Sequence, residues 1–341
     1  MSNKLYQYLG LASPKRGDVG LELEVEAVVG PLPAVNEKKW RTKEDGSLRW
    51  HAREYVTSEP VGAGDTLHGR IKYLTDKLQN PLIGVLPNSP RTSFHVHVNV
   101  TNLTPKQIWT AACAYWLFEN VLVRHCDEGL GTREGNAFCL RLTDAEACLP
   151  RIKTDLKHHR FPFEKLNNDG IRNMGLNLSA LARYGSLEIR TMRGSIDPDI
   201  LTQWAQELNT LVNRSINFPS PANLMDTYYR DFGVVNRLLF TEQFQNIIRA
   251  IPDWRDLVEE NIGILCEIAY VHDWDKWEAK LDKTVDFGPM RVPIPVEPEP
   301  FPDVEEPQPP IEAFDPFRAR LNHDRNFQFQ VRRHPINEDF R

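Results

Sequence analysis

Acidic and histidine side chains recur at alternate positions in two segments that have the pattern of β-strands. Residues 19–27, VGLELEVEA, carry Glu22, Glu24 and Glu26, and residues 93–100, SFHVHVNV, carry His95 and His97. Alternate residues of a strand lie about 6.6 Å apart on the same face. Three neighbouring carboxylates repel one another, and a divalent cation or arginines on an adjacent strand would relieve this repulsion. The pattern indicates a metal site, although a solvated acidic edge has the same pattern.

A third segment adds a positive charge to this chemistry. In residues 186–192, SLEIRTM, Glu188 and Arg190 share one strand face, and Arg193 follows closely. An arginine beside a metal-bound glutamate can neutralise a phosphate, although a cross-strand salt bridge explains the pair equally well. If the histidines join the carboxylates, the hard oxygen ligands favour magnesium or manganese over zinc.

Composition and missing motifs exclude several other classes of protein. The sequence contains no GxxxxGK[ST] phosphate loop and no GxSxG nucleophile motif. Its net charge of -6, from 41 basic and 47 acidic residues, argues against a surface that binds nucleic acid throughout. The five cysteines include no CxxC pair, so we expect reduced thiols rather than a disulfide scaffold or a zinc knuckle.

The elements that must position these residues predict an α+β fold. Strand patterns occur at residues 19–27, 53–60, 93–100, 173–179 and 186–192. Helical patterns occur at residues 67–78, 105–126, 198–212, 241–251 and 254–271. Two of these helices have clear start signals, Thr104-Pro105 and Asp197-Pro198.

The order of six short segments resembles the amidoligase family of carboxylate–amine ligases, which is related to glutamine synthetase and glutamate–cysteine ligase. The matching segments are Gly20–Glu24, Glu44–Leu48, Glu54–Pro60, His95–Val98, residues 173–181 and Tyr184–Arg190. The resemblance covers about residues 17–217. It implies a curved, mainly antiparallel sheet with helices packed on one face, as in the catalytic domain of glutamine synthetase. It also implies ATP and Mg²⁺ or Mn²⁺ as cofactors.

The resemblance further implies an ATP-dependent reaction that forms an amide bond through an acyl phosphate. The metal ligands that it implies are Glu22, Glu24, Glu54, His95 and Glu188. The residues near the nucleotide or substrate would be His97, Arg172, Asn177 and Arg190. The catalytic residues would be Arg190, Arg193 and Glu54. The acid and the amine are not identified, and they could be amino acids, peptides, proteins or modified bases.

Two alternatives stay open beside the ligase. One is a non-catalytic phage structural or scaffold protein that retains the ligase fold. The other is a different metal-dependent enzyme, such as a hydrolase that uses His95 and His97. Members of the family occur in bacteriophages, so a phage source and the host cytoplasm are the expected setting.

We expect four parts along the chain: a catalytic domain at 1–217, a helical extension at 218–288, a linker at 289–316 and a tail at 317–341. The linker is proline-rich and acidic, with nine prolines between residues 289 and 310, and this composition favours an extended chain. The tail has six arginines against three acidic residues and is either a surface-draped segment or a docking arm for a protein partner. No signal peptide or membrane span is recognisable, so we expect a soluble cytoplasmic protein.

Overall fold

The structure is a computed structural model that describes residues 2–44, 46–49, 51–127, 133–145, 147–161 and 169–284. Its contacts divide the chain into two units, Met1–Val292 and Pro293–Arg341. The first unit contains all the described residues. The predicted linker at 289–316 and tail at 317–341 lie outside them.

The centre of the first unit is an open antiparallel sheet, so the α+β class is confirmed. Its strands are β1 (Val19–Ala27), β2 (Trp40–Lys43), β3 (Ala52–Thr57), β4 (Val85–Leu86), β5 (Ser93–Asn99), β6 (Leu176–Asn177) and β7 (Ser186–Arg193). They follow the order β2-β3-β1-β5-β7-β6, and β4 pairs with one end of β1. The two strands with the most acidic and histidine residues, β1 and β5, are therefore direct neighbours in the middle of the sheet.

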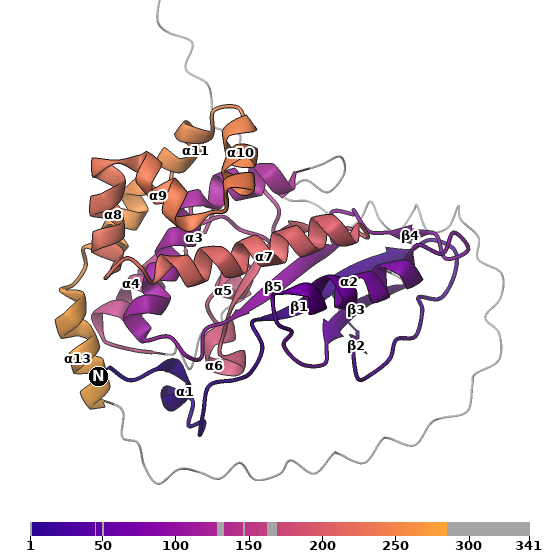
Figure 1. Cartoon of the computed structure of the whole chain (residues 1–341), viewed down its shortest axis with the longest axis horizontal. Helices are drawn as coiled ribbons and strands as arrows, with labels where there is room; N and C mark the ends of the chain where they lie inside the picture. The colour runs from indigo at the N-terminus through magenta and orange to yellow at the C-terminus, as the bar shows by residue number, and fades with distance from the viewer. Residues whose placement is uncertain are drawn as a thin grey trace, which may run out of the picture. The chain divides into compact units, whose positions relative to one another are not determined.

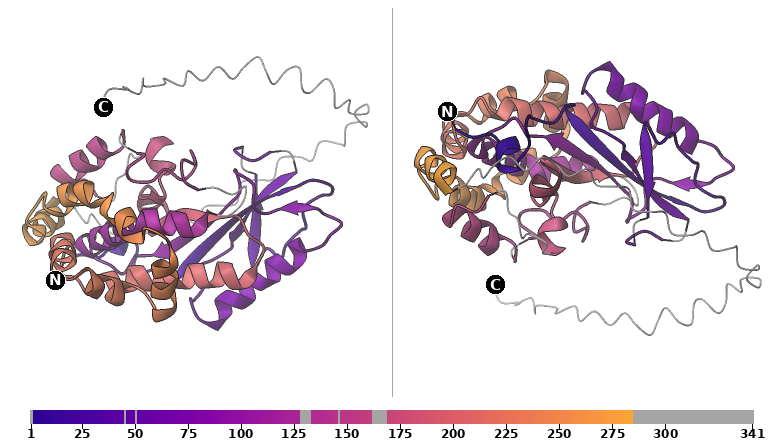
Figure 2. Two further views of the ribbon diagram at one scale, coloured as in Figure 1. Left: turned by 90° about the horizontal axis from the view of Figure 1, so that it is seen from above. Right: turned by 90° about the horizontal axis from the view of Figure 1, so that it is seen from below.

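The two faces of the sheet differ sharply in chemistry. On β1, the apolar residues Val19, Leu21, Leu23 and Val25 are almost completely buried. Helices α2 (Asp65–Leu78), α3 (Pro105–Cys126) and α7 (Pro198–Ser215) pack on this apolar side, and Figure 1 and Figure 2 show α2 and α7 running along it. The opposite face carries the glutamates and histidines, which the alternation of strand side chains places together.

Local signals in the sequence fix where the long helices begin. The Thr104 hydroxyl accepts a hydrogen bond from the backbone N–H of Gln107, and the Gln107 side chain bonds back to the Thr104 backbone. At α7, the Asp197 carboxylate accepts hydrogen bonds from the backbone N–H groups of Asp199 and Ile200. Both helices start where the sequence predicts, because these side chains satisfy N–H groups that have no partner within the helix.

The helical part after α7 packs on α3 and α7. It comprises α8 (Pro221–Arg230), α9 (Phe232–Leu239), α10 (Glu242–Ala250), α11 (Trp254–Glu259), α12 (Ile262–Ala269) and α13 (Trp274–Thr284). The prediction of a single helix at 254–271 was wrong: the chain turns at Asn261, which separates α11 from α12. This residue is fully buried, and its side chain donates a hydrogen bond to the carbonyl oxygen of Trp116.

Shorter elements complete the described chain and correct two further expectations. The short helices are α1 (Leu5–Tyr8), α4 (Leu149–Lys157), α5 (Asp169–Arg172) and α6 (Ala180–Tyr184). The strand expected at 173–179 is limited to Leu176–Asn177, because α6 begins at Ala180. The strand expected at 53–60 ends at Thr57, where Pro60 is close and has no N–H to continue the ladder. No helix among the described residues is both long and apolar enough to cross a membrane.

Candidate functional site

The sheet register brings the predicted residues together on the polar face in cross-strand pairs. These pairs are Glu22 with His95, Glu24 with Glu54, and His97 with Glu188. On the far side of β7, Asn177 of β6 lies opposite Glu188. Lys43 on β2 lies opposite Glu54 on β3. The titratable side chains of the cluster therefore come from five strands, β1, β2, β3, β5 and β7.

Glu22, His97 and Glu188 form a group whose ligand atoms all lie within 4.8 Å of one another. The Nε2 atom of His97 lies 3.3 Å from Glu22 Oε1 and 3.9 Å from Glu188 Oε2. This nitrogen is buried and has no hydrogen-bond partner among the described residues. A buried nitrogen without a partner, aimed between two carboxylates, fits the ligand set of a divalent cation.

The orientation of His97 is fixed from its other side. Its Nδ1 atom lies 3.1 Å from the Ser186 hydroxyl, and the ring contacts Tyr184 edge-on at 5.5 Å between centroids. A second-shell hydrogen bond of this kind fixes the tautomer and the ring direction of a metal-binding histidine. The resemblance places His97 near the nucleotide and His95 on a metal, whereas the geometry favours His97 as a ligand.

The charges within this group stabilise one another. Burial alone would raise the pKa of Glu22, but His95 and His97 hold it well below its usual range. Burial likewise acts to raise the pKa of Glu188, and Arg190 with the two histidines outweighs it, so the pKa is lowered. The pKa of His97 is raised, because Glu188 and Glu22 outweigh the cost of burying its charge. Both carboxylates are therefore ionised at neutral pH and available as ligands.

Ser93 determines how the His95 ring presents its nitrogens. The Ser93 hydroxyl donates its only proton to Glu24 Oε2 and lies 2.6 Å from His95 Nε2, so it must accept a hydrogen bond from that nitrogen. In a neutral ring the Nδ1 atom then has a lone pair, 3.3 Å from Glu22 Oε2. A doubly protonated ring would instead donate from Nδ1 to Glu22, so His95 can serve as a second nitrogen ligand in its neutral form.

Glu54 lies at the edge of the cluster and titrates differently. Its carboxylate is 3.4 Å from the Lys43 ammonium group. Burial and the nearby charge of Glu22 raise the pKa of Glu54 to about 7, although Lys43 acts to lower it. A carboxyl group with this pKa can accept or donate a proton near neutral pH.

Arg190 and Asn177 both hold Glu188. The Arg190 guanidinium donates to Glu188 Oε1 and lies 3.4 Å from His95 Nδ1. The Asn177 side chain donates to Glu188 Oε2 at 2.7 Å, and its own oxygen accepts from the Ser179 backbone N–H. Both oxygens of Glu188 are thus fixed, which positions the carboxylate against His97.

Three residues considered in the sequence have other surroundings. Arg172 ends α5 and is exposed, and among the described residues no hydrogen bond or ion pair joins it to the cluster. The Arg193 guanidinium donates to the carbonyl oxygen of Cys126 at the end of α3, so its catalytic role stays a prediction. Glu26 is explained, because it accepts two hydrogen bonds from the Arg49 side chain and one from the Arg49 backbone.

A pocket of about 350 Å³ opens over the Glu22 and His97 end of the group. Four basic side chains line it: Lys15, Arg41, Lys43 and Arg183. Tyr184 and Ser186, which hold His97, lie in the same wall. Cations around a pocket with carboxylates at its floor suit a ligand that is both anionic and bound to a metal ion.

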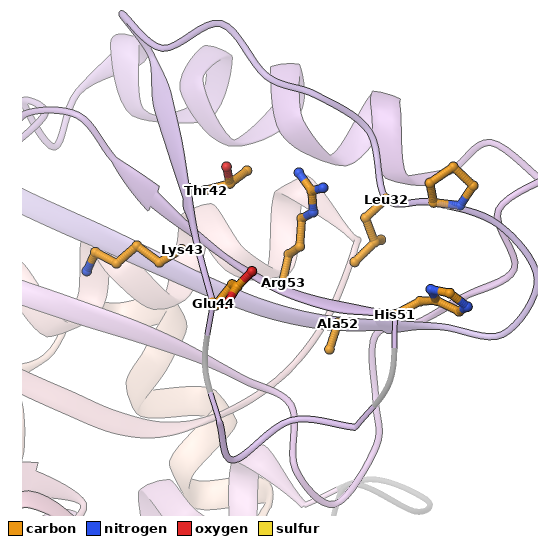
Figure 3. Close-up of a pocket in the computed structure, with 8 residues that line it drawn as sticks. Leu32, Thr42, Lys43, Glu44, His51, Ala52 and Arg53 are labelled. Carbon is orange, nitrogen blue, oxygen red and sulfur yellow. The ribbon is translucent and has the colours of Figure 1, made fainter. Parts of the chain in front are cut away.

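A second pocket, of about 440 Å³, lies at the edge of the sheet beside β2 and the start of β3. Figure 3 shows Arg53 and Thr42 pointing to one side of the strands, while Lys43 extends away from them. Lys43 lines both pockets. The one ammonium group of the edge strand β2 therefore borders both cavities and contacts the acidic cluster through Glu54 and Glu22.

Comparison of the chain with models of protein families and with curated proteins finds no match. The residues of the site that sequence reasoning missed are Ser93, Ser186, Lys43 and Tyr184. Ser93 and Ser186 had a usable signal, since each lies two residues from a predicted site residue on the same strand face. Lys43 had none, because β2 is a short edge strand of mixed polar residues.

Proposed function

We propose that this chain is an ATP-dependent carboxylate–amine ligase that uses Mg²⁺ or Mn²⁺. The observation that carries the proposal is the buried group of Glu22, His97 and Glu188, with Arg190 bound to Glu188 and four basic side chains around the adjoining pocket. Phosphoryl transfer depends mainly on positioning and on neutralising phosphate charge. The site offers metal ligands and cations in the arrangement that this chemistry needs.

The proposed reaction has two steps. A substrate carboxylate attacks the γ-phosphorus of ATP, so that the bond to ADP breaks and an acyl phosphate forms. The amine then attacks the acyl carbon, an amide bond forms, and inorganic phosphate leaves. A bound divalent cation supplies charge neutralisation and orientation for the phosphate oxygens.

The chain's own residues have separate tasks in this scheme. Glu22, His97 and Glu188 hold the cation, and His95 and Glu24 complete the acidic cluster beside it. Arg190 neutralises the charge that develops as the phosphoryl group moves. Glu54, with a pKa near 7, accepts the proton that the amine loses. Lys43 and Arg41 face the pocket and attract the polyphosphate.

The fold is consistent with the resemblance found in the sequence. The open antiparallel sheet has helices on one face and the candidate ligands on the other, as expected for a glutamine synthetase-like catalytic domain. The register that pairs Glu22 with His95 and His97 with Glu188 supports the same arrangement. We therefore include that fold in the proposal.

The test is phosphate release with MgATP and a panel of carboxylate and amine pairs. We expect release that requires an acid, an amine and ATP together. Arg190→Ala should lower the turnover by on the order of 100-fold or more and weaken ATP binding less, because its contact is strongest in the transition state. Hydrolysis that needs no ATP and survives Arg190→Ala would contradict the ligase proposal.

A further inference from the structure

Arg190 lies at an irregularity in β7. Phe94 of β5 pairs with Met192 of β7, whereas Val96 pairs with Ile189. Two residues of β7, Arg190 and Thr191, therefore lie opposite the single residue between Phe94 and Val96. This is a β-bulge, which leaves one residue unpaired and redirects side chains.

The two residues of the bulge point to opposite faces of the sheet, as neighbours in a regular strand do, and the bulge changes the direction of the residues that follow them. Thr191 is fully buried, and its hydroxyl bonds the Tyr115 hydroxyl on α3. Arg190 points to the polar face and contacts Glu188. In a regular strand Met192 would share the face of Arg190, but the extra residue returns Met192 to the core, where it is 1% exposed.

One side chain satisfies the backbone carbonyl groups of the bulge. The Arg133 guanidinium donates through Nη2 to the Arg190 carbonyl oxygen at 2.8 Å and through Nε to the Thr191 carbonyl oxygen at 3.1 Å. Its Nη1 lies 3.5 Å from the carbonyl oxygen of Thr92, the residue just before β5. Arg133 thus spans both strands at the point where their ladder is interrupted.

Burying the charged side chain of Arg133 beside the bulge costs free energy. Its side chain is 1% exposed, and burying a guanidinium is expensive unless its donors are satisfied. A neutral core residue would fill the space, but it could not donate three hydrogen bonds in a fixed fork. The rigid fork matches the carbonyl groups of the two bulge residues, Arg190 and Thr191.

The neighbouring strand contacts the same point. The Arg190 backbone N–H donates to the Gly175 carbonyl oxygen at 2.8 Å. A side chain at position 175 would place its Cβ 2.7 Å from Glu119 Oε1, so the Glu119 carboxyl group would have to move. The bulge is therefore held by Gly175, by Tyr115 through Thr191, and by Arg133.

We infer that Arg133 is a positioning residue of the site: it holds the backbone carbonyl groups of the bulge from which the Arg190 side chain reaches Glu188 and His95. It acts through the backbone and does not touch the metal ligands. Its effect on turnover rests on the function proposed above, whereas its effect on Arg190 can be measured without any substrate.

The test compares Arg133→Lys, which keeps the charge but loses the fork, with the control Arg214→Lys. Arg214 also donates to a backbone carbonyl oxygen, that of Phe240, but it lies outside the site. NMR of the arginine side chains should show that the Arg190 Nε–H resonance shifts or broadens in Arg133→Lys and is unchanged in Arg214→Lys. An unchanged Arg190 resonance in Arg133→Lys would overturn the inference.

A double-mutant cycle on MgATP affinity distinguishes positioning of Arg190 from a general loss of structure. MgATP affinity should fall about tenfold in Arg133→Lys, while Mn²⁺ affinity stays within about threefold. In an Arg190→Met background, Arg133→Lys should lower MgATP affinity less than twofold further, because residues that act through one contact are not additive. Fully additive losses would overturn the inference. If the wild type binds no MgATP, the proposed function fails, and the NMR result still decides the role of Arg133.

A measurement on the wild type covers the case in which Arg133→Lys does not fold. The Arg133 Nε–H group should exchange with solvent as slowly as the amides of β7, since it is buried and bonded to Thr191. The exposed Arg255 is the reference for fast exchange. Exchange of Arg133 at the rate of Arg255 would show that it does not hold the bulge.

Discussion

Glu188 on the polar face of the sheet and Glu119 on helix α3 are both buried, but their surroundings shift their pKa values in opposite directions. At neutral pH Glu188 is ionised and Glu119 is mostly neutral. Glu188 contacts Arg190 and two histidines, which lower its pKa. Glu119 is fully buried, and burial raises its pKa to about 8, although the Leu142 backbone N–H and Arg141 act to lower it. The comparison shows that burial of a carboxylate does not make a metal site. Cationic partners must keep it ionised.

The two regions also differ in how completely their polar atoms are satisfied. Both oxygens of Glu188 have hydrogen-bond donors, Arg190 and Asn177. One oxygen of Glu119 accepts from the Leu142 backbone N–H, and the other has no partner among the described residues. An uncharged Glu119 tolerates this, whereas an ionised one would not. The surroundings of Glu188 are therefore suited to binding a cation, whereas those of Glu119 are suited to packing within the core.

The largest expected effect comes from removing the cation that keeps Glu188 charged. Arg190→Ala leaves a buried carboxylate with less compensation, which typically costs about 3–5 kcal/mol. We expect a loss of at least about 3 kcal/mol in the free energy of unfolding measured with urea at pH 7.5. Arg255→Ala, at an exposed site, should change it by less than about 0.5 kcal/mol. Equal small losses in both variants would mean that Glu188 does not depend on Arg190.

A smaller effect on the free energy of unfolding should follow from replacing Glu119 with glutamine, which does not titrate. Burial raises its pKa in the folded protein to about 8 from an ordinary value of 4.5, so its contribution to stability is fully present below about pH 4.5. That contribution is lost as the pH rises towards 8, because the unfolded chain releases the proton first. Glu119→Gln should remove this loss and raise stability at pH 8, relative to pH 5, by on the order of 2 kcal/mol.

The check on Glu119 is urea unfolding of both proteins at the two pH values. Glu207→Gln is a suitable control, because Glu207 is also a buried glutamate on a core helix and accepts from Thr241. If the difference between pH 5 and pH 8 is the same in wild type and in Glu119→Gln, Glu119 is ionised in the folded protein. The contrast with Glu188 would then disappear.

The smallest expected effect concerns the hydrogen bond that orients His95. Ser93→Ala removes the acceptor for His95 Nε2–H, so the ring is free to exchange tautomers. We expect about tenfold weaker Mn²⁺ binding by calorimetry, as for other groups that orient metal ligands. Long-range proton–nitrogen NMR should show a neutral His95 protonated at Nε2 in the wild type and a mixture in the variant.

Ser215→Ala is the matched control, because Ser215 is an equally buried serine that donates to a backbone carbonyl in α7. It should leave the Mn²⁺ affinity unchanged. A wild-type His95 protonated at Nδ1 but not at Nε2 would contradict the hydrogen-bond direction assigned to Ser93.

Much of this site could be predicted because strand alternation is a local property. The sequence around Glu22 and Glu24, and around His95 and His97, indicates one polar face without any knowledge of pairing. The starts of α3 and α7 were equally predictable, since Thr104 and Asp197 cap the turns that follow them in the sequence.

What could not be predicted depends on contacts between distant parts of the chain. The bulge at Arg190 follows from how β5 and β7 pair and from Arg133, which lies more than fifty residues before it in the sequence. Lys43 reaches Glu54 only because β2 pairs with β3, and β2 has no apolar alternation. The contact of Arg193 with the carbonyl oxygen of Cys126, at the end of a helix, was also hidden in the sequence.

The most direct test of the central claim is calorimetric titration of Mn²⁺, and then of MgATP, into wild type, Glu188→Gln and Glu119→Gln. The account predicts that the wild type and Glu119→Gln bind both ligands with affinities within about threefold of each other. Glu188→Gln loses a charged ligand of the group and should bind Mn²⁺ at least about 100-fold more weakly, in line with the loss of a metal-ligating carboxylate. Wild-type affinity in Glu188→Gln, or an equal loss in Glu119→Gln, would contradict the assignment of the metal to the polar face of the sheet.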